Sequence, residues 1–198
     1  MRLLTVLFAS LLTSAAFGQV INMGVPDSYQ VGYAANLSSG DSYIDMSNTG
    51  ASSLGFGSGT LCENFYVFDQ EEELLACCSC TVTSGAGVSL SVNNSLLSNT
   101  VTGVMPTSVT IDVVSTLDTG VCDATSVTAA QLAPGAVIWN THLHPAQSAF
   151  TPAATTECPF ASANLTAAQL VRLTEGCSFT IAFYSGAGIC KGCQSSDQ

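Results

Sequence analysis

Two histidines form the clearest metal-ligand pattern in the chain. His142 and His144 are its only histidines, and one residue separates them in the β-prone run 136–144. Alternate side chains of a strand share a face, so a strand here would direct both imidazoles to one side, as a zinc or copper site requires. A metal site needs three or four converging ligands, and no third ligand is identifiable. Two solvent-facing histidines without a function remain the alternative.

Nine cysteines are the second group of residues that could take part in chemistry. An oxidising environment favours disulfides, and an odd number leaves one thiol over. The spacing does not fix the pairing. In a strand, Cys78 and Cys80 would share a face and Cys77 would point the other way, so that one strand could be linked to two layers. The disulfide candidates are Cys62, Cys77, Cys78, Cys80, Cys122, Cys158, Cys177, Cys190 and Cys193.

Two alternatives compete with this disulfide framework. The cysteines within residues 77–80, together with Cys190 and Cys193, could supply thiolates to zinc or to an iron–sulfur cluster. Alternatively, Cys190 and Cys193 could form a redox-active pair beside Lys191. Zinc knuckles normally have C-x2-C in both halves, and a thioredoxin-like site lies in a βαβ pattern. The sequence does not show that βαβ pattern, and an oxidising environment favours disulfides over metal-bound thiolates, so we expect no cofactor.

No motif identifies a reaction. The G-x-S-x-G elbow of a serine hydrolase is absent, and Glu71–Glu73 is more typical of a solvated turn than of a calcium loop. Gly55–Gly59 is rich in glycine but carries no lysine, unlike a phosphate-binding loop. We therefore expect a protein without catalytic activity.

Charge is scarce in this chain of 198 residues. Only 9% of residues are charged, with three Lys or Arg against fourteen Asp or Glu, whereas about 25% is usual. Nucleic-acid binding needs a basic surface, so the composition disfavours it, and it equally disfavours charged disorder.

The first 18 residues have the pattern of a signal peptide. Met1 and Arg2 precede an apolar run, Leu3–Leu12, and Ala16-Phe17-Gly18 provides small residues for cleavage. The apolar run is too short to span a membrane. We expect a secreted protein, extracellular or at the cell surface, in which residues 19–198 form one domain that is not inserted in a membrane.

Short β-prone runs separated by turn residues predict an all-β fold. Val88–Val92 and Ser108–Val113 alternate apolar and polar residues, as half-buried strands do. Their near-regular spacing favours a mainly antiparallel, Greek-key-like β-sandwich. The other predicted strands are Tyr29–Ala34, Ser42–Met46, Asn64–Phe68, Leu74–Thr83, Ala136–His144 and Phe179–Tyr184.

One short helix is predicted near 167–175. Thr166 and Gln169 form a capping box, in which each side chain satisfies a backbone amide of the other residue. Gly176 occupies the position at which a left-handed residue commonly ends a helix.

Three segments together resemble a known group of proteins. They are Leu61–Cys80, Val88–Thr100 and the ending Gly188–Cys193. The chain resembles a family of uncharacterised, secreted, cysteine-containing proteins of soil bacteria. The resemblance implies secretion and a single domain, and it transfers no activity or catalytic residue.

Our leading functional hypothesis is a non-catalytic structural protein, an adhesive or fibre-forming subunit that associates with itself or with other surface proteins. Uncharged strands leave sheet edges poorly protected against pairing with another chain. An extended segment, 19–35, could complete the sheet of a neighbouring subunit. Its expected contact residues are Val20, Ile21, Tyr29, Val31 and Tyr33.

Two alternatives stay open. A secreted ligand-binding module could stack a glycan on Trp139, Tyr66 or Tyr184, although aromatic residues in β-prone runs are usually buried. A metal or redox protein would use His142, His144 and the cysteines.

Overall fold

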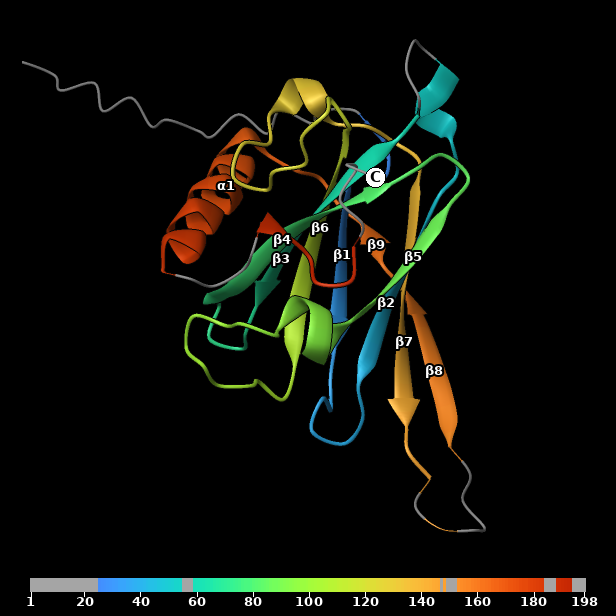
Figure 1. The fold of residues 1–198 in the computed structure, drawn as a ribbon, viewed down its shortest axis with the longest axis vertical. Coiled ribbons are helices and arrows are strands. Elements are labelled where there is room, and N and C mark those ends of the chain that lie inside the picture. The colour runs from blue at the N-terminus through green and yellow to red at the C-terminus, as the bar shows by residue number, and fades with distance from the viewer. Residues whose placement is uncertain (1–24, 55–58, 147, 149–152, 184–187, 194–198) are drawn as a thin grey trace, which may run out of the picture.

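The computed structural model describes residues 25–54, 59–146, 148, 153–183 and 188–193. These residues form two face-to-face β-sheets with one helix on the outer face of the larger sheet (Figure 1). The predicted disulfide-linked, mainly antiparallel β-sandwich is confirmed. The strands are β1 Tyr29–Ala34, β2 Ser42–Asn48, β3 Leu61–Phe68, β4 Leu74–Val82, β5 Gly87–Ser91, β6 Val109–Leu117, β7 Ala136–His144, β8 Ala154–Pro159, β9 Ala161–Ser162 and β10 Gly188–Ile189, and the helix α1 spans Ala167–Ala182.

The six-stranded sheet has the order β10-β4-β3-β6-β1-β9, and the four-stranded sheet has the order β5-β2-β7-β8. Neighbouring strands are antiparallel except β10 and β4. The chain stays within a sheet through the β3–β4 and β7–β8 hairpins and through α1, and it crosses between the sheets elsewhere. These crossings bring residues distant in sequence onto neighbouring strands, as in a Greek key.

Strand periodicity places the core between the two sheets. Every second residue of β2 is buried, including Ile44 and Met46. Phe65, Ile111 and Ile138 come from β3, β6 and β7 and are buried in the same cluster. Burying an aliphatic or aromatic side chain of this size contributes about 1.5–3 kcal/mol.

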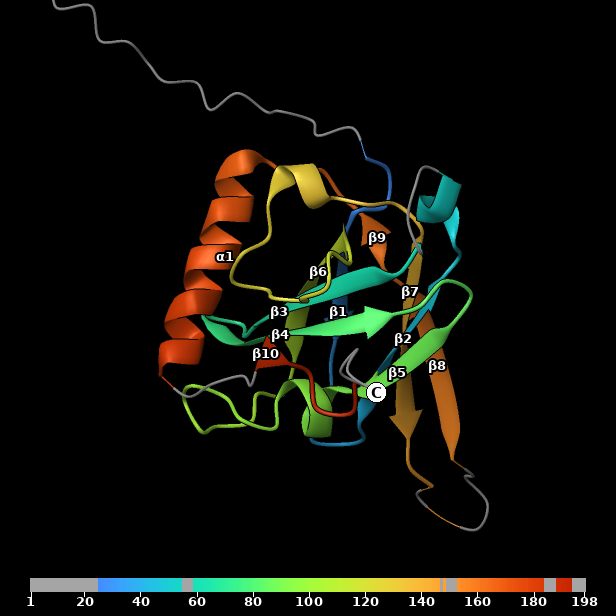
Figure 2. The ribbon, with the colours of Figure 1, turned by 45° about the horizontal axis from the view of Figure 1, so that its top comes forward.

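A second apolar cluster lies between the six-stranded sheet and α1 (Figure 2). Tyr66, Val114, Leu170 and Leu173 are buried there. The molecule therefore has three layers: the four-stranded sheet, the six-stranded sheet, and α1 with the 118–135 connection.

Disulfides link β4 to elements on both of its faces. Cys77 bonds to Cys177 of α1, and the neighbouring Cys78 and Cys80 bond to the C-terminal segment. This arrangement confirms the prediction that one strand is linked to two layers. The sulfurs of the C-terminal pair are each committed to β4, so they form neither a redox pair nor a metal cluster. The four disulfides are Cys62–Cys122, Cys77–Cys177, Cys78–Cys190 and Cys80–Cys193.

The helix is longer than the sequence predicts. Its capping box is present, with the backbone N–H of Gln169 donating to Thr166 Oγ1 at 3.1 Å, but Gly176 does not end the helix. A Cβ on Gly176 would lie 3.2 Å from Leu74 Cδ2, so this glycine lies at a close contact with β4. The helix continues to Ala182, because Cys177 is bonded to β4 and Thr180 is buried on the same face. The predicted strand at Phe179–Tyr184 is therefore wrong for residues 179–183, of which Phe183 caps the helix, and Tyr184 lies outside the described residues.

The predicted assembly segment also needs correction. Tyr29, Val31 and Tyr33 belong to β1, which pairs with β6 along its length and with β9 at residues 30–31. Pairing within its own sheet occupies this strand, so it is not an open donor strand. Val20, Ile21 and the predicted signal peptide lie outside the described residues. Among the residues that are described, no helix has the length and apolar character needed to cross a bilayer.

Candidate functional site at the free edge of the β7–β8 hairpin

The two sheets differ in how their edges are protected. The six-stranded sheet ends in β9 and β10, which have two residues each. Very short edge strands offer little backbone for pairing with another chain. The four-stranded sheet ends in β5 and β8, and all six residues of β8 are exposed, whereas β5 ends in two buried residues. The longest fully exposed edge in the described part of the chain is therefore β8.

Hydrogen bonding to β7 determines which backbone groups of β8 are free. The Phe160 amide donates to the Ile138 carbonyl at 2.9 Å, and hydrogen-bonded pairs alternate along an antiparallel ladder. In this register, Cys158 and Thr156 face Asn140 and His142 and direct their backbone groups to β7. The N–H and C=O groups of the intervening residues, 155 and 157, consequently point away from the sheet.

Two features partly protect this edge. Pro159 has no N–H to donate, and Glu157 carries a charge; both are usual devices against edge-to-edge pairing. The remainder, Ala154–Thr156, is uncharged. The single cysteine without a disulfide, Cys158, lies on the same strand and is exposed.

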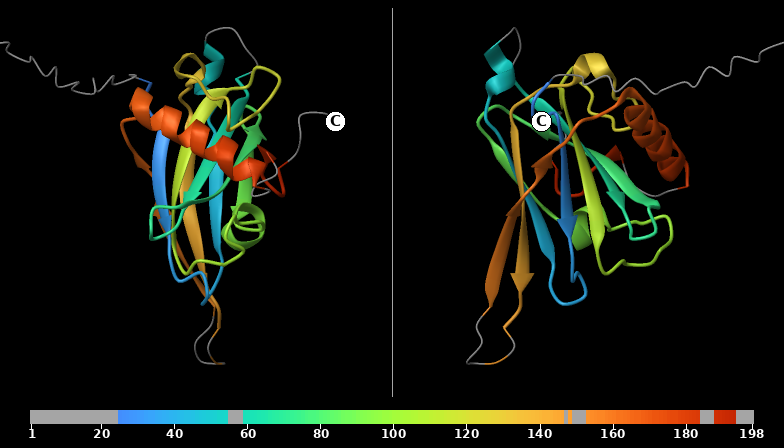
Figure 3. Two further views of the ribbon diagram at one scale, coloured as in Figure 1. Left: turned by 90° about the vertical axis from the view of Figure 1, so that its left-hand side faces the viewer. Right: turned by 180° about the vertical axis from the view of Figure 1, so that it is seen from behind.

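The hairpin extends beyond the body of the sandwich (Figure 3). A concave pocket of about 410 Å³ lies where it meets the turn that precedes β2, between Gly40 and Asp41 on one side and Leu143 and Ala154 on the other. A Cβ on Gly40 would lie 1.9 Å from the Leu143 carbonyl oxygen. The turn can therefore approach the hairpin only because glycine occupies this position.

The predicted histidine pair lies on this hairpin. The rings of His142 and His144 are 4.7 Å apart between centroids and meet edge to face. Ser42 Oγ lies 2.9 Å from His142 Nδ1, and Thr156 Oγ1 lies 2.8 Å from His144 Nε2. Burial lowers the pKa of His142, the charge of His144 adds to this effect, and Asp41 opposes it. The neutral imidazole is thus favoured.

The described residues supply no third ligand beside these rings. Their only group of three candidate ligands within coordination distance is Cys62, Asp118 and Cys122, and its two sulfurs form a disulfide. The metal assignment of the histidine pair stays a prediction. Ser42 is 0% exposed, so the Ser42–His142 contact does not offer a nucleophile to a substrate.

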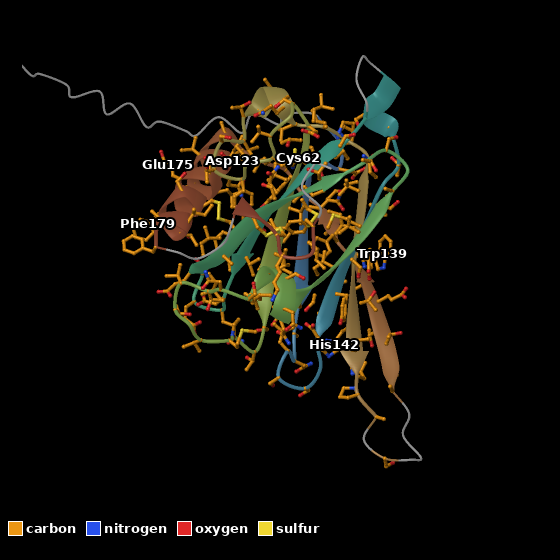
Figure 4. The ribbon with its side chains drawn as sticks, in the orientation of Figure 1. Cys62, Asp123, Trp139, His142, Glu175 and Phe179 are labelled. Carbon is orange, nitrogen blue, oxygen red and sulfur yellow. A yellow bond between two sulfur atoms is a disulfide. The ribbon has the colours of Figure 1, made fainter. Side chains whose placement is uncertain are left out.

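The three aromatic residues predicted to stack on a ligand have different positions. Trp139 lies half-buried on β7 at the outer face of the smaller sheet (Figure 4). Tyr66 is fully buried, and its hydroxyl donates to the Ala124 carbonyl at 2.8 Å. Tyr66 therefore cannot stack on a ligand, and Tyr184 is outside the described residues.

One unusual residue was missed at the sequence level. Glu63 is 1% exposed, Ser115 Oγ donates to its Oε2 at 2.6 Å, and its Oε1 has no hydrogen-bond partner among the described residues. Burial raises its pKa to about 7, and the Ser115 hydrogen bond only partly opposes this effect. Strand alternation contained the signal, because Glu63 shares the inward face of β3 with Leu61 and Phe65.

Comparisons of the chain with protein-family models, with curated proteins and with solved structures each gave no match. The resemblance to secreted proteins of soil bacteria stays a prediction.

Proposed function

We propose that this chain is a non-catalytic extracellular structural subunit that self-associates through the free edge of β8. The observation that carries the proposal is the open row of backbone groups on a fully exposed edge strand. Such an edge is a template for pairing with a strand of another chain. Four disulfides support an extracellular location, because disulfides persist in oxidising compartments.

A two-fold axis through Thr156 gives the best-paired antiparallel contact between two copies. Residue 155 of each copy then faces residue 157 of the other, and both have outward N–H and C=O groups. A two-fold axis through Cys158 would instead place Pro159 of each copy opposite Glu157 of the other, and each of these two pairs would lose a hydrogen bond because proline has no N–H. We therefore propose the register in which the two-fold axis passes through Thr156.

A proline substitution tests the use of this edge. Thr155→Pro removes an outward N–H but leaves the β7–β8 ladder intact, and the control Thr155→Ser keeps the N–H. We expect sedimentation velocity and electron microscopy to show dimers or filaments of the exported protein and of the serine variant, and monomers of the proline variant. A strictly monomeric native protein over its whole soluble concentration range would contradict the proposal.

A cysteine trap tests the register. Thr156 of two copies would face each other as a non-hydrogen-bonded pair with Cα atoms about 4.5 Å apart, within the approximate range of 4.4–6.8 Å for disulfides. The double variant Thr156→Cys/Cys158→Ser should form a disulfide-linked dimer on mild oxidation, whereas Ala154→Cys/Cys158→Ser should not. Efficient cross-linking through the native Cys158 alone would indicate the other register and refute the one proposed.

A further inference from the structure

A second cavity lies on the opposite side of the molecule, between α1 and the outer face of the six-stranded sheet. Its volume is about 320 Å³, which lies at the small end of the approximate range for small-molecule sites. Residues from five separate elements, β1, β3, β4, β6 and α1, and from the β3–β4 turn line it. Those that matter for binding are Tyr29, Phe68, Glu72, Asp112, Gln169 and Arg172.

This cavity concentrates charges that are rare elsewhere. Only 9% of the chain is charged, and Arg172 is one of its three basic residues. The cavity nevertheless has two carboxylates, Asp112 and Glu72, and this guanidinium in its lining. Apolar groups, including the Phe68 ring and Leu173, line the cavity beside them.

A hydrogen bond within the protein holds the Asp112 carboxylate in the cavity. Asp112 is half-buried on β6, and the Tyr29 hydroxyl donates to its Oδ2 at 2.9 Å. Burial raises the pKa of Asp112, and the Tyr29 hydrogen bond opposes this effect. No other side-chain hydrogen bond to Asp112 is present among the described residues, so Oδ1 remains available to a ligand donor.

The mixture of charged and apolar groups favours a ligand that both donates and accepts hydrogen bonds. A simple cation would meet Arg172, a simple anion would meet Asp112 and Glu72, and a wholly apolar molecule would desolvate the carboxylate without giving it a donor. Sugar hydroxyls both donate to carboxylates and accept from guanidinium and amide groups, and the C–H face of a sugar ring packs on an aromatic ring. We propose that this pocket binds a neutral mono- or disaccharide.

In this arrangement the Asp112 carboxylate and the Arg172 guanidinium bind neighbouring hydroxyls, and Phe68 contacts the ring. The Gln169 side-chain oxygen is already used in the capping box, where it accepts from the Thr166 amide at 3.0 Å. Its NH₂ group remains free to donate to a sugar oxygen. The site lies on α1 and the larger sheet, so it is separate from the β8 edge.

Saturation-transfer NMR and calorimetry on the processed protein test this assignment. The probes are glucose, galactose, mannose, N-acetylglucosamine and their β-1,4-linked disaccharides, with propylammonium and acetate as separate arms. We expect at least one sugar to bind and neither ion to do so. Binding of no sugar, or of an ion only, overturns the proposal.

Variants locate the bound sugar. Asp112→Asn and Arg172→Gln should each weaken binding by about tenfold or more, as expected for loss of a charge-assisted hydrogen bond. Glu175→Gln on the exposed part of α1 (Figure 4) and Lys191→Gln should leave affinity unchanged. Arg172 is exposed, so its variant should fold even if the Asp112 variant does not. An unchanged sugar affinity of Arg172→Gln, or equal losses of affinity in the two control variants, would refute this site. The Arg172→Gln variant should self-associate as the native chain does, because the pocket is separate from the β8 edge.

Discussion

Glu63 should make the stability of this protein greater in acid than at neutral pH. Its carboxyl group is buried between the sheets; within the part of the chain that the structure describes, Ser115 donates to Oε2 and no group bonds to Oε1. Its cross-strand neighbour on β4 is Cys80, which is bonded to Cys193 and does not titrate. The inward histidine, His142, lies toward the opposite end of the sandwich (Figure 4). Desolvation of the carboxylate is therefore the dominant effect.

The magnitude follows from linkage between protonation and folding. The pKa of Glu63 rises from 4.5 to about 7 on folding, and one pKa unit corresponds to about 1.36 kcal/mol, so the full effect is about 3 kcal/mol. Between these values the folded state binds more protons than the unfolded state. The contribution of Glu63 is thus fully present below about pH 4.5, decreases as the pH rises, and is lost above about pH 7.

The variant Glu63→Gln isolates this contribution, because the amide has nearly the same shape and does not titrate. Urea unfolding of both proteins between acidic and mildly alkaline pH should show a native protein that loses about 3 kcal/mol relative to the variant. Asp112 contributes in the same direction, whereas Asp123 and His142 oppose it. These contributions cancel in the difference between the two proteins.

Glu175→Gln, at an exposed position on α1, is the control for removing an acid elsewhere. A stability difference between native protein and Glu63→Gln that stays constant across this pH range would refute the reasoning. It would mean that Glu63 has the same protonation state in the folded and unfolded chains.

Three further predictions concern the covalent framework and one close contact. A thiol-reactive dye should label one cysteine of the unreduced protein and none in Cys158→Ser, and labelling of two or more would contradict the disulfide assignment. Replacing both Cys77 and Cys177 by Ser should lower the free energy of unfolding by about 2–5 kcal/mol in denaturant titrations, because this bond closes a loop of about 100 residues. Gly40→Ala should destabilise the protein by about 1–3 kcal/mol in thermal unfolding, because the new Cβ would meet the Leu143 carbonyl oxygen; an unchanged melting temperature would show that the turn can move.

Several elements could be predicted from short stretches of sequence. Ala136–His144 is a β-prone run followed by Pro145 and forms β7 with these bounds. The capping box at Thr166 begins α1 at Ala167. By contrast, β8 was not predicted, because Ala154–Pro159 lacks alternation and contains a proline, and it is a strand because it pairs with β7.

The sequence by itself determined that the fold is mainly β, at which residue the helix begins, and that the cysteines of β4 point to both faces of that strand. These features depend on neighbouring residues, through the two-residue period of a strand and the local hydrogen bonds of a cap. Only the tertiary structure decided which cysteines pair, that α1 continues past Gly176, and that Glu63 is buried beside Ser115. It also decided that β8 is the open edge and that Asp112 and Arg172 line one pocket. These outcomes depend on contacts between residues far apart in the chain, and their energies are set by which surfaces pack together rather than by any local pattern.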